Sequence, residues 1–259
     1  MEERARELER INQELERFAY IASHDLKEPL RGITINANFL LREGLSEAGE
    51  KRVARMMTLC ERMEQLISDL YMFSRLAQPG DPGEIVDCAA IISDLENTLA
   101  EQLRDWNGEI RMETPIPPVV ANPLKMKTVF QNLIVNGLRY NDADRKTVEI
   151  GFLTDVTVKG RAMRDVFYVR DNGIGIEDRF QETIFDIFRR LNTEKAFGAG
   201  TGAGLSFVKK IVEEHGGVIL VDSAPGVGST FYFTLPSKDE TRAGKASDLG
   251  PDDGDEHAK

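Results

Sequence analysis

The residues best suited to chemistry are a carboxylate and two glycines that follow a run typical of a β-strand. Asp171 comes directly after the predicted strand residues 167–170, and Gly173 and Gly175 follow it. Glycines permit a tight turn and let a flat ligand approach the backbone closely. A carboxylate at the end of a strand can accept a hydrogen bond from an adenine amino group. The motif therefore predicts a site for an adenine ring.

A second glycine motif stands directly before a predicted helix at 204–214. Gly200, Gly202 and Gly204 alternate with Thr201 and Ala203. The first backbone N–H groups of a helix and the positive end of its dipole favour phosphate. One such motif is weak, because flexible loops often contain it. Together with the Asp171 motif, it indicates a nucleotide.

The predicted helix at 123–140 carries side chains suited to a metal and to phosphate. Asn132, Asn136 and Tyr140 are four residues apart and share one face, and Arg139 has a similar reach. An amide oxygen suits Mg²⁺, which completes its shell with water and phosphate oxygens, and arginine pairs with phosphate. The alternative is that these asparagines simply face water.

The chain has three histidines, His24, His215 and His257. His215 precedes two glycines at a predicted helix end, where a polar cap is ordinary. His24 falls at an outer position of a heptad pattern, where a donor from outside could reach its imidazole. The next residue, Asp25, could hold one ring N–H and raise the nucleophilicity of the other nitrogen. Taken alone, His24 and Asp25 also fit an ordinary helix surface.

Two apolar seams predict the element that carries His24. Their alternating spacing of three and four predicts an antiparallel helical hairpin over 1–78, whose turn includes 42–44 and 47–49. Pairing of two chains in a four-helix bundle would bury the seams, and Pro29 should bend the first helix. The seam residues are Leu8, Ile11, Leu15, Phe18 and Ala22, then Val53, Met56, Cys60, Met63, Ile67 and Leu70.

A Pro- and Gly-rich linker at 79–83 should end this stem, and a catalytic domain should occupy 84–236. Hairpin patterns dominate there, so we expect an α+β protein whose second domain is a two-layer α/β sandwich. The acidic residues 237–259 should be a disordered tail. The expected strands are 84–87, 109–113, 119–121, 147–158, 165–170, 218–222 and 229–235, and the expected helices are 89–103, 123–140 and 204–214.

Composition restricts the partners and the compartment. A net charge of −11 over 259 residues argues against nucleic-acid binding. No apolar run approaches the roughly 20 residues of a membrane span. Cys60 and Cys88 lack metal-ligand spacing and fit buried thiols in a reducing compartment. We therefore expect a cytoplasmic piece, and its opening in heptad register suggests that an upstream sensor domain is missing from this chain.

Five motifs in order resemble the H, N, G1, F and G2 boxes of sensor histidine kinases, most closely those of the phytochrome-type branch. They span nearly the whole chain apart from the tail. They are Ser23-His24-Asp25-Leu26-Lys27-Glu28-Pro29-Leu30-Arg31, Asn132-Leu133-Ile134-Val135-Asn136, Asp171-Asn172-Gly173-Ile174-Gly175, Ile184-Phe185-Asp186-Ile187-Phe188-Arg189-Arg190-Leu191 and Gly200-Thr201-Gly202-Ala203-Gly204-Leu205.

The resemblance implies a homodimeric phosphotransfer stem and an ATP-binding domain of the Bergerat type. It implies that His24 takes the γ-phosphate of ATP with Asp25 as base, and then passes it to a response-regulator aspartate. Asn136 would ligate Mg²⁺, and residues 192–200 would form the ATP lid, anchored by Phe185 and Phe188. The other implied ATP-binding residues are Asn132, Arg139, Tyr140, Asp171 with Thr230, Gly173, Gly175, Gly200, Gly202, Gly204 and Leu205.

The chain departs from the family pattern at three positions. Arg139 replaces the usual lysine, Ala203 lies between lid glycines, and Gly137 replaces a common alanine, which should weaken the helix by about 1 kcal/mol. Separately, Glu28 stands where bifunctional relatives carry Thr or Asn, which puts phosphatase action in doubt, although Glu is also usual in the phytochrome-type box. Two other functions remain open: an ATPase or serine kinase of the same fold, and a dimeric scaffold that binds nucleotide.

Overall fold

The computed structural model describes residues 26–27, 29–42, 44–75, 83–187, 189, 191 and 201–235. The chain forms two compact units, Met1–Asp81 with Glu177–Lys210, and Pro82–Ile176 with Ile211–Lys259. Within the described ranges, no helix combines the length and the apolar character that crossing a membrane requires.

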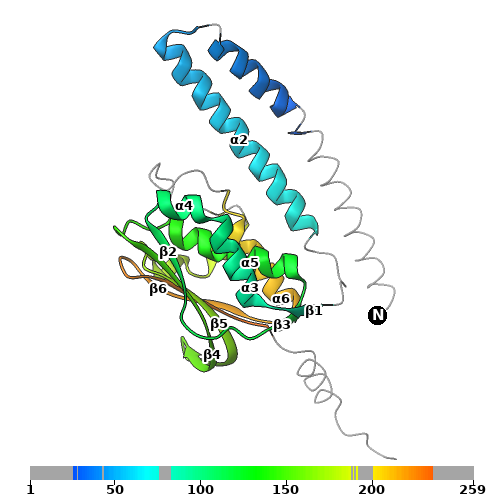
Figure 1. Ribbon diagram of the computed structural model, residues 1–259, viewed down its shortest axis with the longest axis vertical. Coiled ribbons are helices and arrows are strands. Elements are labelled where there is room, and N and C mark those ends of the chain that lie inside the picture. The colour runs from blue at the N-terminus through cyan, green and yellow to red at the C-terminus, as the bar shows by residue number, and fades with distance from the viewer. Residues whose placement is uncertain are drawn as a thin grey trace, which may run out of the picture. The chain divides into compact units, whose positions relative to one another are not determined.

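The first unit contains a helical hairpin. Residues 26–27 and 29–42 are helical, and α2 (Glu47–Arg75) runs back alongside them (Figure 1). The turn is shorter than the sequence predicted, since 47–49 belong to α2. Ser46 caps that helix by accepting a hydrogen bond from Gly49 N at 3.3 Å, and Glu47 and Glu50 suit its positive end.

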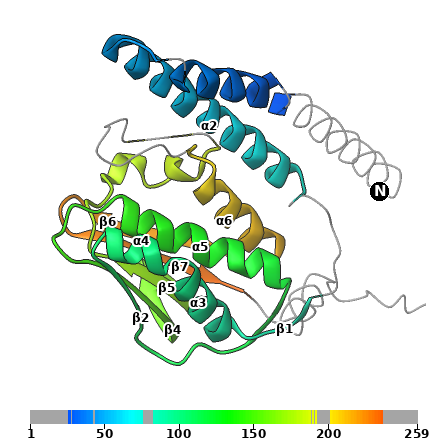
Figure 2. The same ribbon diagram turned by 45° about the horizontal axis from the view of Figure 1, so that its top comes forward.

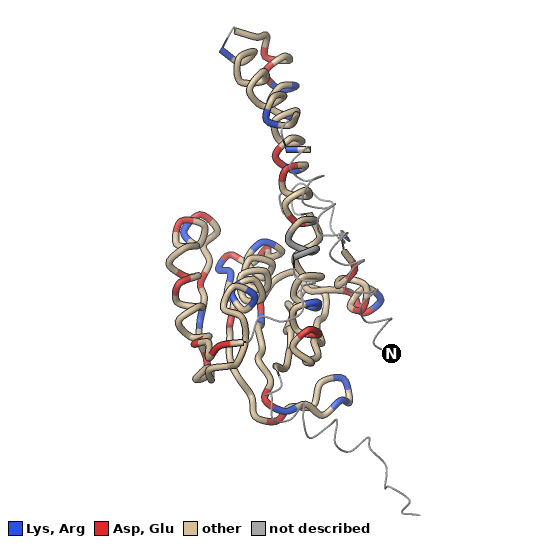
Figure 3. Tube along the Cα trace, turned by 90° about the vertical axis from the view of Figure 1, so that its right-hand side faces the viewer, with Lys and Arg blue, Asp and Glu red and all other residues tan. Residues whose placement is uncertain are grey.

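The hairpin buries one stripe of its predicted seam and exposes another. Val53, Cys60 and Ile67 of α2 are seven residues apart and all buried. Met56 and Met63 alternate with them in the seam but are 45% and 48% exposed. Acidic and basic residues are interspersed along the rest of the hairpin (Figure 3). The single chain therefore leaves an apolar stripe in water.

The second unit is built on a five-stranded sheet. Its strand order is β2 (Gly108–Met112), β4 (Lys146–Val158), β5 (Arg161–Asp171), β7 (Gly228–Thr234) and β6 (Ile219–Ala224). β2 and β4 are parallel and the other pairs antiparallel. β1 (Glu84–Val86) and β3 (Val119–Ala121) form a small separate sheet. β5 begins four residues before the predicted start at 165.

Helices cover one face of this sheet, which confirms the predicted α+β, two-layer arrangement. They are α3 (Cys88–Thr98), α4 (Ala100–Asp105) and α5 (Pro123–Arg139) (Figure 2). The helix expected at 89–103 is interrupted at Leu99, where the backbone leaves helical geometry. α6 (Gly204–Glu214) starts in the first unit and ends in the second. Two short 3₁₀ turns, η1 (Asp178–Phe180) and η2 (Thr183–Phe185), belong to the first unit.

Local chemistry and an aromatic core fix the position of α5. Asn122 caps its start, because the side-chain oxygen accepts hydrogen bonds from Leu124 N and Lys125 N at 2.9 and 3.2 Å. Phe130 of α5 is fully buried and packs edge-on against Phe167 and Phe233 of the sheet, with ring centroids 6.3 and 5.9 Å away. The helix is therefore held rigidly over β5 and β7.

Candidate functional site

Asp171 lies at the end of β5, with its side chain toward α5. Its Oδ1 accepts hydrogen bonds from Gly173 N at 2.9 Å and from Ser229 N at 3.2 Å. Among the described residues, Oδ2 has no protein donor. Burial raises the pKa of Asp171 to about 6, although the two backbone hydrogen bonds act in the opposite direction. The site therefore offers a largely desolvated acceptor for a ligand amino group.

The loop after Asp171 folds tightly onto two neighbouring segments. A Cβ on Gly173 would collide with the Tyr140 carbonyl, and Gly175 has φ +71° and would meet the Ala224 carbonyl. Ile174 N donates to Tyr140 O at 3.1 Å. Both glycines are thus required by close backbone approach, which is a more specific reason than general turn flexibility.

Gly137 explains why α5 can lie so close to Asp171. A Cβ at this position would lie 2.9 Å from Asp171 Cβ and 3.0 Å from Val148 Cγ2. From the sequence, glycine at this position was expected only to weaken the helix. In the structure, the absence of a methyl group also lets the Asp171 carboxylate pack directly on the helix.

The predicted side chains of α5 are all half-buried but differ in their hydrogen bonds. Asn132 is half-buried and donates to Thr128 O at 2.8 Å, so its amide oxygen remains available. The half-buried side chain of Asn136 makes no hydrogen bond to any described residue. Tyr140 is the C-cap of α5, and its carbonyl binds the loop. Arg139 is the last residue of α5 and is half-buried.

Ser229, which sequence reasoning missed, takes the place at Asp171 that was expected for Thr230. The strand register pairs Asp171 with Ser229 and Arg170 with Thr230. Since side chains alternate between the faces of a sheet, Thr230 lies on the side opposite Asp171. Its hydroxyl accepts a hydrogen bond from Arg170 Nε at 3.4 Å. Only the register, which links distant segments, identifies Ser229.

The second glycine motif begins α6 in the first unit. Gly202 has φ +82°, and Gly204 and Leu205 are the first residues of the helix. Ala203 is fully buried, so a small residue is required there, and its carbonyl accepts a hydrogen bond from Ser206 Oγ at 2.7 Å. Within this unit, the Thr201 hydroxyl donates to Asp69 of α2. The Lys209 ammonium lies 5.9 Å from the ring centre of Phe185.

Several predicted residues lie outside the described ranges. These are His24, Asp25, Glu28, Phe188, the lid at 192–200 with Gly200, the linker except Gly83, and the tail. His215 is described and has the expected capping role, since its Nδ1 lies 2.7 Å from the Ile211 carbonyl oxygen.

The residues around Asn136 fit a magnesium ion held with a phosphate. Within the described part of the chain, no cluster of three or more His, Cys, Asp or Glu residues could hold a metal by itself. Two amide oxygens one turn apart are hard donors, and Mg²⁺ commonly takes one or two protein ligands and completes its shell with phosphate and water.

Two family models match the chain. Residues 14–79 match the His Kinase A (phospho-acceptor) domain. Residues 121–239 match the histidine kinase-, DNA gyrase B- and HSP90-like ATPase family. The second match contains Asn132, Asn136 and Asp171.

Two relatives are similar to this chain in sequence. Cyanobacterial phytochrome B of Nostoc sp. is 46% identical over 232 residues, which are 88% of this chain and 30% of that protein. The phytochrome-like protein Cph1 of Synechocystis sp. is 37% identical, over 90% of this chain and 30% of that protein. The chain thus spans about a third of the length of these relatives.

A solved structure supports the fold. Full-length ShkA in complex with AMPPNP has a TM-score of 0.62 and 22% identity, over 84% of this chain and 45% of that one. The two domain matches and the phytochrome-type relatives show that the chain belongs to the sensor histidine kinases, of which it carries the catalytic core.

Proposed function

We propose that the chain uses Mg-ATP to phosphorylate His24 and then transfers the phosphoryl group to an aspartate of a response regulator. The single observation that carries this proposal is the packing of Asp171 on Gly137. It sets a desolvated acceptor beside the helix that carries Asn132 and Asn136, in a chain that also matches a phospho-acceptor domain. The part of α5 around Gly137 suits the adenine ring, and the part that carries Asn132 and Asn136 suits Mg²⁺ held with a phosphate.

In this proposal each residue has a defined task. Oδ2 of Asp171 accepts the adenine amino group, with Ser229 and Gly173 holding Oδ1. Arg139 and Tyr140 line the nucleotide site beside Gly173 and Gly175. The glycines 200, 202 and 204, with Leu205, bind the phosphates at the start of α6. Asn136, assisted by Asn132, would hold Mg²⁺, which neutralises phosphate charge.

The transfer step is an in-line substitution at the γ-phosphorus. An imidazole nitrogen of His24 forms the new P–N bond as the bond to the β,γ-bridging oxygen breaks and ADP leaves. Asp25 accepts or orients the ring proton on the other nitrogen. The phosphoryl group next passes to a carboxylate of a receiver domain.

The exposed stripe of the hairpin supports the proposal of a homodimer. Met56 and Met63 alternate with the buried residues of the same seam, and a second copy would cover them in a four-helix bundle. We propose that residues 1–78 form this stem, 79–83 the linker, 84–236 the ATP-binding domain and 237–259 a tail. A cytoplasmic location and control by an upstream sensor domain complete the proposal.

The decisive experiment is incubation with Mg²⁺ and γ-labelled ATP, comparing the unmodified chain with His24→Ala. We expect label that is labile in acid, stable in base and absent from the variant. Label that survives the substitution would instead favour an ATPase or serine kinase of the same fold. Nucleotide binding without any label would favour a non-enzymatic scaffold.

Two further measurements test the cofactor and the metal ligand. Chelation of Mg²⁺ should abolish labelling, and Asn136→Ala should reduce it strongly while the circular dichroism spectrum stays unchanged. Undiminished labelling of Asn136→Ala would remove Asn136 from the proposed site. Undiminished labelling after chelation would remove Mg²⁺ from the proposal.

A further inference from the structure

Asn141, just beyond the end of α5, is a buried amide with a complete set of partners. It is 2% exposed. Its Nδ2 donates to Gly137 O at 3.1 Å and to Asn172 Oδ1 at 2.8 Å, and its Oδ1 accepts from Ala143 N at 3.0 Å. A buried amide is costly unless its polar atoms are paired. Asn141 therefore links the last turn of α5 to the residue after Asp171.

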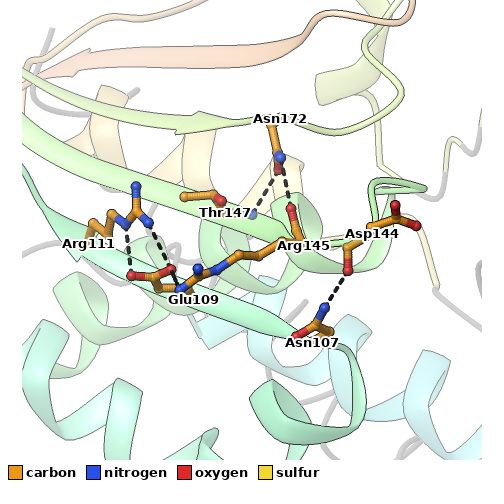
Figure 4. Close-up of polar contacts among 7 residues, drawn as sticks. All are labelled: Asn107, Glu109, Arg111, Asp144, Arg145, Thr147 and Asn172. Atoms are coloured by element: carbon orange, nitrogen blue, oxygen red, sulfur yellow. Dashed lines mark hydrogen bonds and ion pairs between the residues drawn. The ribbon is translucent and has the colours of Figure 1, made fainter.

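Asn172 uses its side chain to end the pairing between β4 and β5. The last paired residues of the two strands are Val148 and Asp171. One step further, Thr147 N donates to the side-chain Oδ1 of Asn172 at 2.8 Å, and Nδ2 of Asn172 donates to Arg145 O at 3.0 Å (Figure 4). The side-chain carbonyl replaces a main-chain carbonyl in the ladder, so the backbone is free to turn away after Asp171.

That turn sets the orientation of the Asp171 carboxylate. Gly173 N reaches back to Oδ1 at 2.9 Å only because the chain has left the strand at Asn172. Ile174 N is tied to Tyr140 O, the residue before Asn141. The end of α5 thus holds both sides of the turn, through a side chain at Asn141 and a carbonyl at Tyr140.

We propose that Asn141 is a positioning residue for adenine recognition, which acts through Asn172 to fix the Asp171 carboxylate relative to α5. The inference rests on the proposed role of Asp171 in binding adenine. The position of the Asp171 carboxylate relative to the proposed metal ligands of α5 would then depend on one amide–amide hydrogen bond, between residues 31 positions apart.

The test compares ADP and GDP binding to the full chain by calorimetry. An adenine amino group donates to the carboxylate, whereas guanine presents an acceptor at the same position. A shifted Asp171 should therefore weaken ADP selectively. For Asn141→Leu, we expect ADP affinity to fall about tenfold and GDP affinity to stay within about twofold. A merely structural role would weaken both nucleotides alike.

Asn172→Ala serves as a second variant, because this residue is exposed and its replacement leaves Asn141 bonded to Gly137. It should reduce the ratio of ADP to GDP affinity similarly, and the double variant should lose little more than either single one. Asn107→Gly is the matched control. It removes the 2.5 Å hydrogen bond from Asn107 Nδ2 to Asp144 O, which anchors the loop 140–145 between α5 and β4 without involving the Asn141 or Asn172 side chain. The φ of +50° at Asn107 suits glycine.

The possible outcomes separate the inference from the function on which it rests. A preserved preference for ADP in folded Asn141→Leu and Asn172→Ala would overturn the inference alone. An equal loss in Asn107→Gly would also overturn it, because any loosening of the loop would then suffice. Equal affinity of the unmodified chain for ADP and GDP would refute the adenine role of Asp171, and the inference with it.

Discussion

Replacement of Asp171 by Asn should stabilise the protein at neutral pH while weakening nucleotide binding. The structure buries this carboxylate, and its pKa rises from 3.8 to about 6. The folded state therefore binds a proton that the unfolded state has already released between these pH values. The contribution of Asp171 to stability is greatest below pH 3.8 and is lost as the pH rises through about 6.

The size of the effect follows from the shift. About two pKa units correspond to about 3 kcal/mol between acid and neutral pH, of which about half falls between pH 5 and 8. Asn keeps an oxygen for Gly173 N and Ser229 N but cannot ionise. The free energy of unfolding of Asp171→Asn, minus that of the unmodified chain, should thus rise by about 1.4 kcal/mol from pH 5 to pH 8.

Urea unfolding monitored by Trp106 fluorescence measures this difference, because Trp106 is the single tryptophan and lies in the second unit. Asp142→Asn, at an exposed carboxylate, controls for the change in net charge. ADP affinity should fall by about tenfold or more, since an amide NH₂ would face the adenine amino group. A stability difference that is constant across this pH range would refute the reasoning about burial.

Three further predictions test the packing that supports the site. Gly137→Ala should not gain the roughly 1 kcal/mol of stability that helix propensity offers, because the new Cβ would lie 2.9 Å from Asp171 Cβ. Calorimetry should also detect weaker ADP binding. A full gain in stability with unchanged ADP affinity would contradict this. Phe130→Ala should lower the free energy of unfolding by about 3–5 kcal/mol, because the ring is fully buried against Phe167 and Phe233; a loss below about 1 kcal/mol in urea titrations would show that α5 is not held by this cluster. Lys125→Met should cost about 1 kcal/mol, because Lys125 pairs at 2.5 Å with Glu214 at the end of α6 and both side chains are partly buried; the variant Lys51→Met removes an exposed pair with Glu47 and should change stability much less.

Local sequence signals predicted most of the elements of the fold. Pro123 predicted the start of α5, because a proline in the first turn of a helix acts within a few residues. The alternation of Val53, Cys60 and Ile67 with Met56 and Met63 predicted the hairpin seam, because helical periodicity is a property of the chain itself. The predicted start of β5 was four residues too late, and Leu99 divided a helix that propensity alone would have continued.

The chemically active residue types were also visible in the sequence. Asp171, its two glycines and the asparagines of α5 were recognised from order and spacing. Their partners were not, because Ser229 reaches Asp171 through a register that joins strands 58 residues apart. Alternation along one strand predicts which residues share a face, but only pairing decides which neighbour they meet.

The sequence by itself thus determined which elements form and which side chains could bind a nucleotide. Only the tertiary structure decided which residues contact those side chains and how deeply they are buried. The raised pKa of Asp171 comes from desolvation by neighbours on other elements, the need for glycine at position 137 comes from contact with Asp171, and the pairing of Asn141 with Asn172 comes from the meeting of α5 with the end of β5. Burial and contacts depend on residues that are distant in the chain, so local composition does not predict them.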